Sequence, residues 1–188
     1  MIYFQRHGES ETNVKKIFTC RKIDPELTDH GQQQIKNKIP YFESRNIKKI
    51  ISSPSKRAIQ SANIIGEALK IEVQKNENLL EINIGDLEGK SEMDPVHLDS
   101  FFQILTDWQI NHVNSRFTNG ESKSEMDIRV KNIFSIAESD TIYVCHAGFI
   151  ACAMAIYSFP FKTIQDLFLP RAGTATYSLK ERVWEIIK

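Results

Sequence analysis

The fold is constrained most by an alternation of short strand-like runs with longer segments of helical periodicity. Apolar, β-branched and aromatic residues fill the runs at 2–5, 47–52 and 141–145, and amphipathic segments separate them. Two further runs, at 174–179 and 183–187, flank a polar turn and predict an antiparallel pair of strands. This alternation is typical of α/β proteins, in which helices pack on the faces of a central sheet.

Segments with apolar residues at helical spacing predict the helices around that sheet. The predicted helices begin at Thr28 or Asp29, after Pro54, at Ser122 or Ser124, and at Ala147. We expect the first to end near 44–46, or earlier if Pro40 breaks it, and the last to reach Ser158. The stretch from 90 to about 119 also has helical spacing and no strand signal, which predicts a small helical insertion.

Length and charge narrow the class of protein. The 188 residues suit one domain, and 24 basic residues balance 24 acidic ones, so no overall basic field favours nucleic acid or an anionic membrane. Three cysteines without CxxC spacing argue against a disulfide framework and favour a reducing compartment. No leader-like or membrane-spanning run stands out, so we expect a cytoplasmic protein.

Basic side chains and histidines follow three of the predicted strands. Arg6 and His7 come directly after the first strand, His146 follows the strand at 141–145, and Arg57 lies just beyond the second strand. Because the carboxyl ends of parallel strands meet at one sheet edge, we expect these side chains to converge. The N-terminal end of a helix is partially positive, so an arginine in the first turn of a helix is unfavourable, and a bound anion would offset this repulsion. A neutral imidazole between arginines is suited to phosphoryl transfer.

Six ordered motifs extend this pattern along the chain. They are Arg6-His7-Gly8-Glu9-Ser10-Glu11-Thr12-Asn13, Leu27-Thr28 with Gly31 and Gln33, Ser52 to Ala58 with Gln60-Ser61-Ala62, Leu80-Glu81 with Gly85 to Gly89, Gly120-Glu121-Ser122 with Arg129, and Val144-Cys145-His146-Ala147-Gly148. Together they resemble the histidine phosphatase superfamily, whose founding members are the cofactor-dependent phosphoglycerate mutases. An ordered set of this kind is far more specific than a lone Arg-His-Gly triplet.

The resemblance implies both a fold and a set of roles. It implies a phosphoglycerate mutase-like, three-layer α/β/α sandwich with a mostly parallel sheet, as a single domain over 1–188 with a helical cap at about 90–119. The implied roles are His7 as the nucleophile that becomes phosphohistidine, Arg6, Arg57 and His146 as the phosphate cradle, Glu81 as proton donor, and Asn13 and Ala147 as further substrate contacts. The surrounding cations should lower the pKa of His7 and keep its imidazole neutral.

Each of these residues also has a purely structural interpretation. Either histidine alone could be a satisfied core residue, Glu81 a loop carboxylate and Asn13 a turn residue, and the 121–122 element could simply cap a helix. A thiol dyad of Cys145 with His146 is disfavoured, because successive strand residues point to opposite faces. His30, His97 and His112 show no metal-ligand spacing, so we predict no metal and no cofactor.

The chain's shortness and its Gly85-Asp86-Leu87-Glu88-Gly89 segment are more similar to the phosphatase branch, although many phosphatases have tryptophan at Leu87 and glycine at Ala147. We therefore predict a metal-independent phosphatase acting on a small phosphate ester, with a bisphosphate-primed mutase or a non-catalytic phospho-ligand-binding protein as alternatives. The resemblance is compatible with a homodimer. The substrate's organic part should contact the 90–119 insertion and Arg171, whereas Phe101, Phe102 and Trp108 are better interpreted as core than as pocket lining.

Overall fold

In the computed structural model, which describes residues 1–109 and 115–187, the chain forms a six-stranded sheet in the order β3-β2-β4-β1-β5-β6. The strands are β1 (Ile2–Arg6), β2 (Lys49–Ser52), β3 (Val73–Lys75), β4 (Thr141–Cys145), β5 (Thr174–Ser178) and β6 (Val183–Ile187). The α-helices are α1 (Glu11–Val14), α2 (Asp29–Lys36), α3 (Ile39–Glu43), α4 (Lys56–Leu69), α5 (Pro95–Gln109), α6 (Lys123–Ser135) and α7 (Ala147–Ile156). Short 3₁₀ turns are η1 (Glu77–Leu79), η2 (Gly85–Leu87) and η3 (Ile164–Leu167).

The sheet is mostly parallel, as predicted. Strands β1, β4, β2 and β3 pair in parallel, while β5 runs antiparallel to both β1 and β6. In the central pair, Arg6 lies opposite Cys145. The next residues, His7 and His146, therefore leave neighbouring strands at the same sheet edge. This register brings together two histidines from opposite ends of the chain.

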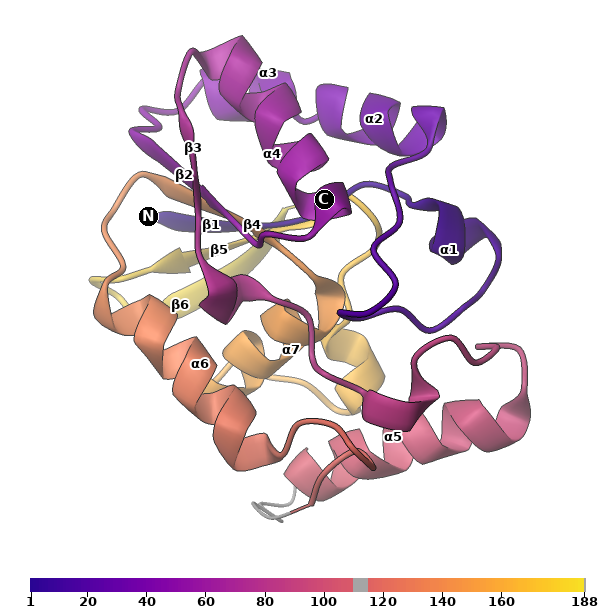
Figure 1. The fold of residues 1–188 in the computed structure, drawn as a ribbon. Helices are drawn as coiled ribbons and strands as arrows, with labels where there is room; N and C mark the ends of the chain where they lie inside the picture. Colours follow the sequence, from indigo (N-terminus) through magenta and orange to yellow (C-terminus); the bar gives the residue numbers. More distant parts are fainter. Residues whose placement is uncertain (110–114, 188) are drawn as a thin grey trace.

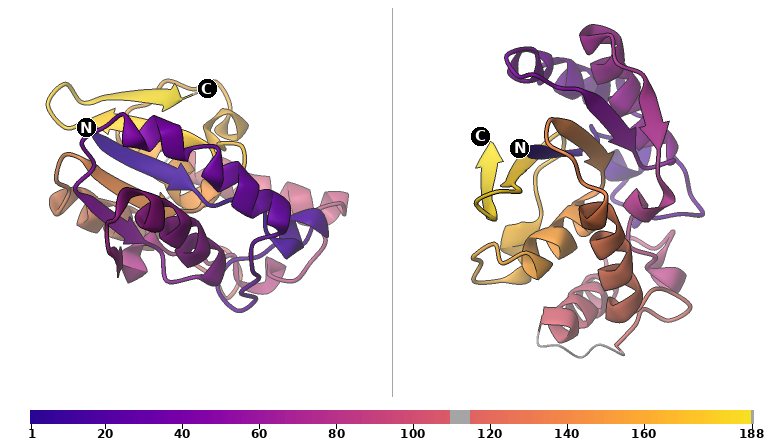
Figure 2. Two further views of the ribbon diagram at one scale, coloured as in Figure 1. Left: turned by 90° about the horizontal axis from the view of Figure 1, so that it is seen from above. Right: turned by 90° about the vertical axis from the view of Figure 1, so that its left-hand side faces the viewer.

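Helices cover both faces of the sheet, which makes the three layers visible in Figures 1 and 2. Helices α2, α3 and α4 lie over one face, where their apolar residues pack against Tyr3, Ile50 and Ile142. Helices α6 and α7 lie over the other face, with α5 farther from the sheet. Because side chains alternate along each strand, neighbouring positions of β1 and β4 supply the two separate cores.

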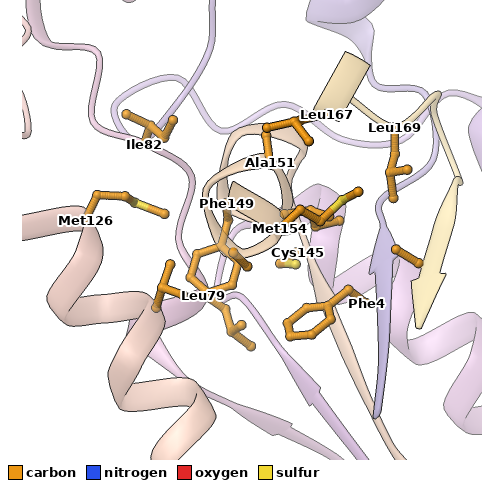
Figure 3. Packing of buried hydrophobic residues seen from close by; sticks show 14 of the residues in the cluster. Phe4, Leu79, Ile82, Met126, Cys145, Phe149, Ala151, Met154, Leu167 and Leu169 are labelled. Atoms are coloured by element: carbon orange, nitrogen blue, oxygen red, sulfur yellow. The ribbon is translucent and has the colours of Figure 1, made fainter. Parts of the chain in front are cut away.

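The core beneath α7 determines how closely that helix approaches the sheet. Figure 3 shows Phe4, Cys145 and Phe149 meeting between β1, β4 and α7, with Leu79 and Met126 closing the side toward α6. The α7 sequence is rich in alanine and glycine and is almost wholly buried, so its backbone can lie close to the strands. The α7 N-terminus is thereby held firmly at the sheet edge where the two histidines emerge.

Most predicted elements are confirmed, with differences that have local causes. The helix predicted from Thr28 is divided into α2 and α3, because Pro40 has no N–H and occupies the first turn of a new helix. Thr28 caps α2, and Ser122 caps α6 in a capping box with Glu125. Strand β3 was missed, since it is short and lies at the sheet edge. The predicted insertion contains α5, although residues 110–114 lie outside the described residues.

Candidate active site

A cavity of about 280 Å³ opens beside the carboxyl ends of β1 and β4, large enough for a small phosphorylated molecule but not for a macromolecule. The lining residues are Arg6, His7, Thr12, Asn13, Ile17, Phe18, Thr19, Arg57, Glu81, Ile82, Ile84, Glu92, Leu98, Phe101, Phe102, Ala147, Gly148, Gln165 and Phe168. Two guanidinium groups, an imidazole and two carboxylates thus share one cavity with an aromatic wall. Arg6, His7 and Arg57 converge at this sheet edge as predicted, whereas His146, a predicted phosphate contact, is absent from the described lining of the cavity.

The His7 ring is held so that one nitrogen carries no proton and can act as a nucleophile. Its Nδ1 lies 2.6 Å from the carbonyl oxygen of Gly8, which can only accept, so Nδ1 carries the proton. Its Nε2 accepts a hydrogen bond from Arg57 Nε at 3.2 Å. The unshared electron pair of Nε2 therefore faces the guanidinium group that would bind an anion.

The surroundings of His7 keep the ring neutral. Burial is the largest cause that lowers its pKa well below the usual value, followed by the positive charges of Arg57 and Arg6, whereas the hydrogen bond to Gly8 acts in the opposite direction. The residue is only 4% exposed. An imidazole in this environment is unprotonated, and hence nucleophilic, at neutral pH, as predicted.

Arg6 and Arg57 are fixed by backbone carbonyls that leave other N–H groups unused. Arg6 Nη1 donates to the carbonyl of Leu169, and Arg57 Nη2 donates to that of Cys20 at 3.3 Å. Within residues 1–109 and 115–187, Arg6 Nε and Arg57 Nη1 are buried without a hydrogen-bond partner, although Arg57 Nη1 lies 3.8 Å from Asp24 Oδ1. Buried donors are normally paired, so unpaired ones directed at one cavity are typical of an anion site.

His146 lies directly behind His7, with the two ring centroids 5.2 Å apart. Its Nε2 is 2.9 Å from Ser53 Oγ and 3.2 Å from Ser55 Oγ, while Nδ1 is buried without a partner in the described part of the chain. Burial, then the charge of Arg57, lowers the pKa of His146 well below its usual value. The serines of the segment after β2 therefore orient this ring.

The Glu81 side chain reaches the site from the loop after η1 and is held by backbone N–H groups. Its Oε1 accepts from Ile82 N at 2.8 Å and Phe149 N at 3.1 Å, and its Oε2 accepts from Gly148 N at 3.2 Å. Two of these donors belong to the first turn of α7, whose partial positive charge attracts a carboxylate. A Cβ atom on Gly148 would lie 2.5 Å from Glu81 Oε1, so only glycine permits this approach.

Comparison with known proteins agrees with this geometry. Residues 2–188 match the family model of the histidine phosphatase superfamily, branch 1.

The chain belongs to the histidine phosphatase superfamily.

The relatives of this chain include proteins named as phosphatases and proteins named as phosphoglycerate mutases. A Hydrogenobacter thermophilus protein named "Putative phosphoserine phosphatase 2" is 31% identical over 78% of this chain and 73% of its own length. A 2,3-bisphosphoglycerate-dependent phosphoglycerate mutase of Thermoplasma acidophilum is 28% identical over 81% of this chain and 73% of its own. The crystal structure of a Thermus thermophilus phosphoglycerate mutase shares the fold, with a TM-score of 0.75 at 19% identity over 100% of this chain and 98% of its own.

A clamp formed by Arg129 holds the loop that carries Glu81 in this histidine phosphatase. Arg129 Nη1 donates to the carbonyls of Asn78 and Leu80 at 2.6 and 2.8 Å. Its Nε and Nη2 bind the two oxygens of Glu121 at 2.6 and 2.8 Å. Sequence analysis matched the 120–122 element with Arg129 to a motif of the family, with a helix cap as the structural alternative. The structure shows that Ser122 is a helix cap and that Glu121 forms an ion pair with Arg129 beside the loop that carries Glu81.

The outcome for the remaining predicted contacts is mixed. Asn13 and Ala147 line the cavity, and Asn13 Oδ1 accepts from Ser10 N and Oγ at 3.1 Å, which leaves its amide nitrogen as the available donor. Arg171 was expected to contact the substrate but is absent from the lining of the described cavity.

The aromatic residues of α5 were expected to be core rather than pocket lining. That interpretation is correct for Trp108, which is 5% exposed, and wrong for Phe101 and Phe102, which are half-buried and line the cavity. Leu87 packs outside the cavity lining.

Cys145 Sγ donates a hydrogen bond to the carbonyl oxygen of Tyr143 at 3.9 Å, and among the described residues no hydrogen bond joins it to the His146 ring. In residues 1–109 and 115–187 no group of three or more histidine, cysteine or acidic residues is arranged to hold a metal ion. His112 lies outside the described residues.

Among the described helices, none combines the length and apolar character that crossing a membrane requires.

Proposed function

We propose that this histidine phosphatase hydrolyses a small phosphorylated metabolite through a phosphohistidine at Nε2 of His7. The observation that carries the proposal is the pair of buried guanidinium groups of Arg6 and Arg57 beside the unprotonated Nε2 of His7, each with an N–H group that has no hydrogen-bond partner among the described residues. These groups match the equatorial oxygens of a phosphoryl group, and donors arranged in advance are usually the largest catalytic contribution. Asn13 adds its amide, and Ala147 adds the first turn of α7.

In the first step, Nε2 of His7 forms a bond to phosphorus while the P–O bond to the substrate's alcohol breaks. Glu81, in its acid form, gives its proton to the departing oxygen, so the alcohol leaves neutral. The phosphorylated ring carries positive charge, and the Gly8 carbonyl that accepts from Nδ1–H stabilises it. The arginines hold the transferred group throughout.

In the second step, water attacks phosphorus and the P–N bond breaks. The Glu81 carboxylate takes the proton of that water, which restores both the acid and the neutral His7. The hydrogen bonds from the first turn of α7 keep the carboxylate in place between the two steps. Neither step uses a metal ion or an organic cofactor.

The main alternative is a phosphoglycerate mutase, an activity named for several relatives. A phosphoglycerate has a carboxylate besides its phosphate, and a mutase also binds a bisphosphate. Among the residues described as lining the cavity, however, the only cationic side chains are Arg6 and Arg57, both at the His7 end. The rest of the described lining is apolar, neutral polar or acidic, which favours the phosphatase over the mutase.

The test compares the wild type with His7→Ala on a generic aryl phosphate, in the presence of a chelator. We expect phosphate release by the wild type, an acid-labile phosphoryl label on His7, and a loss of at least about 10³-fold in the variant. With 3-phosphoglycerate and a bisphosphate primer, isomerisation with little free phosphate would establish the mutase instead. Wild-type turnover by His7→Ala would refute the mechanism.

Five expectations from the sequence stay predictions. They are a single domain over 1–188, independence of metals, absence of nucleic-acid binding, a homodimer and a cytoplasmic location.

A further inference from the structure

Glu92 is a charged residue of the cavity lining that the proposed phosphate chemistry does not use. A phosphate dianion balances Arg6 and Arg57, and the backbone N–H groups of α7 compensate Glu81. Glu92 also lines the cavity, and in residues 1–109 and 115–187 no ion pair or hydrogen bond engages its carboxylate. One negative charge thus faces the space that the organic half of a substrate must occupy.

The position of Glu92 is set by its backbone. Its N–H donates to the Lys16 carbonyl at 2.8 Å, next to an antiparallel bridge between Ile17 and Ser91. This pairing fixes the residue to the loop that follows α1, beside the phosphate end. Its charge is close enough to Arg6 to act on the pKa of that guanidinium, in the direction of raising it. Glu92 therefore belongs to the cavity and is half-buried.

Aromatic rings form the wall near this carboxylate. Phe18, Phe101, Phe102 and Phe168 all line the cavity and contact one another, with ring centroids 5.2 to 6.3 Å apart for the pairs that meet. Leu98, which is 36% exposed, adds an apolar edge. Rings together with one carboxylate are the combination that binds organic ammonium groups, because the ring face and the carboxylate both attract a cation while the ring surface accepts its carbon substituents.

We propose that the substrate is a phosphomonoester whose organic half carries an ammonium group, bound by Glu92 and by the rings of Phe18, Phe101, Phe102 and Phe168. The proposal rests on the phosphatase function given above and names the substrate class of the same site. It also explains the lack of further cations along the described lining, which would repel such a group. An additional carboxylate on the substrate would be disfavoured by Glu92.

The test uses pairs of substrates that differ only in charge. Each pair consists of an ω-trimethylammonioalkyl phosphate and the neutral alkyl phosphate in which carbon replaces nitrogen, with spacers of increasing length. For at least one spacer, we expect the wild type to have a kcat/KM for the ammonium member about two- to five-fold above that of its neutral isostere, the range of a solvent-exposed ion pair. In Glu92→Gln this ratio should fall most of the way toward one.

Two further variants separate local from general effects. Asp99→Asn removes the same charge from an exposed residue of α5 that is outside the cavity lining, and it should keep the wild-type ratio. Phe102→Leu keeps an apolar side chain but removes a ring, and it should lower the ratio by a smaller factor. A wild-type preference for the neutral member at every spacer, or a ratio that Glu92→Gln leaves intact, would overturn the proposal.

Binding of the same pairs to His7→Ala, measured by calorimetry, distinguishes this proposal from the phosphatase function. If the ammonium members bind more tightly, and Glu92→Gln in the same background removes that preference, the recognition is established even where no substrate is hydrolysed. In that case only the phosphatase function fails. Equal binding of both members in the two backgrounds refutes the ammonium site, whatever the catalytic result.

Discussion

The contact between Gly148 and Glu81 gives the sharpest test of how the proton donor is positioned. In Gly148→Ala the new Cβ would lie 2.5 Å from Glu81 Oε1 and 2.7 Å from Ile82 Cδ1. The carboxylate oxygen would have to move by about 0.9 Å to reach an ordinary van der Waals contact of 3.4 Å. The hydrogen bonds that Oε1 accepts from Phe149 N and that Oε2 of the same carboxylate accepts from Gly148 N would then lengthen or break.

A displacement of about 1 Å in a catalytic group can cost about 100-fold in rate. Because Glu81 protonates the departing oxygen, the loss should depend on the leaving group. We expect kcat/KM to fall about 100-fold for an alkyl phosphate, and only a few-fold for 4-nitrophenyl phosphate, whose phenolate leaves without a proton. Overpacking costs about 1–3 kcal/mol and the better helix propensity of alanine returns about 1 kcal/mol, so the fold should persist.

The assay is the slope of log kcat/KM against leaving-group pKa for a series of aryl and alkyl phosphates. Gly66→Ala is the matched control: it adds a methyl group to a glycine in α4, 2.7 Å from the Ile71 carbonyl oxygen and away from the cavity. The control should lower stability but keep the wild-type slope. Equal losses for all leaving groups in Gly148→Ala, or no loss, would refute the reasoning about Glu81.

Other predictions concern stability and thiol reactivity. Burial, then the charge of Arg57, lowers the pKa of both His7 and His146 well below the usual value. Below about pH 6.5 the unfolded chain therefore binds protons that the folded chain excludes. As the pH is lowered below this value, the free energy of unfolding should decrease by up to about 1.4 kcal/mol per pH unit for each histidine. Urea unfolding at several pH values should show a shallower dependence for His7→Gln, and an unchanged one would contradict the assignment. Arg129→Met removes the more buried of the two arginines that pair with Glu121, since Arg21 Nη2 also lies 3.1 Å from Glu121 Oε2, and should cost up to about 3 kcal/mol. The double variant with Glu121→Met should recover part of that loss, and additive losses in denaturant melts would argue against coupling. Burial, together with the hydrogen bond to Glu88, raises the pKa of Cys20 to about 12, so this thiol should resist iodoacetamide at about pH 8. Rapid alkylation of Cys20 in the folded protein, detected by peptide mass spectrometry, would show that the thiol is not buried in this way.

Patterns that are local in the sequence predicted the elements of this fold. The strands that end at Arg6 and Cys145, the caps at Thr28 and Ser122, and the break at Pro40 follow from side-chain shape, periodicity and missing N–H groups over a few residues. The expectation that Arg6, His7, Arg57 and His146 converge needed only the rule that ligands bind beyond the carboxyl ends of parallel strands. Their convergence could therefore be predicted before any coordinates were known.

The orientation and state of those groups depended on the tertiary structure. The tautomer of His7 depends on the Gly8 carbonyl, the place of Glu81 depends on α7 and on the Arg129 clamp, and the charge of Glu92 faces the cavity because two distant loops pair. None of these contacts produces a periodic pattern in the sequence, because each is made through backbone N–H or carbonyl groups, which do not depend on the side chains. The sequence alone thus determined which reactive groups gather at the sheet edge. Long-range packing decided which nitrogen of His7 carries no proton. It also decided that backbone N–H groups bind the Glu81 carboxylate, whereas the Glu92 carboxylate lines the cavity without such partners.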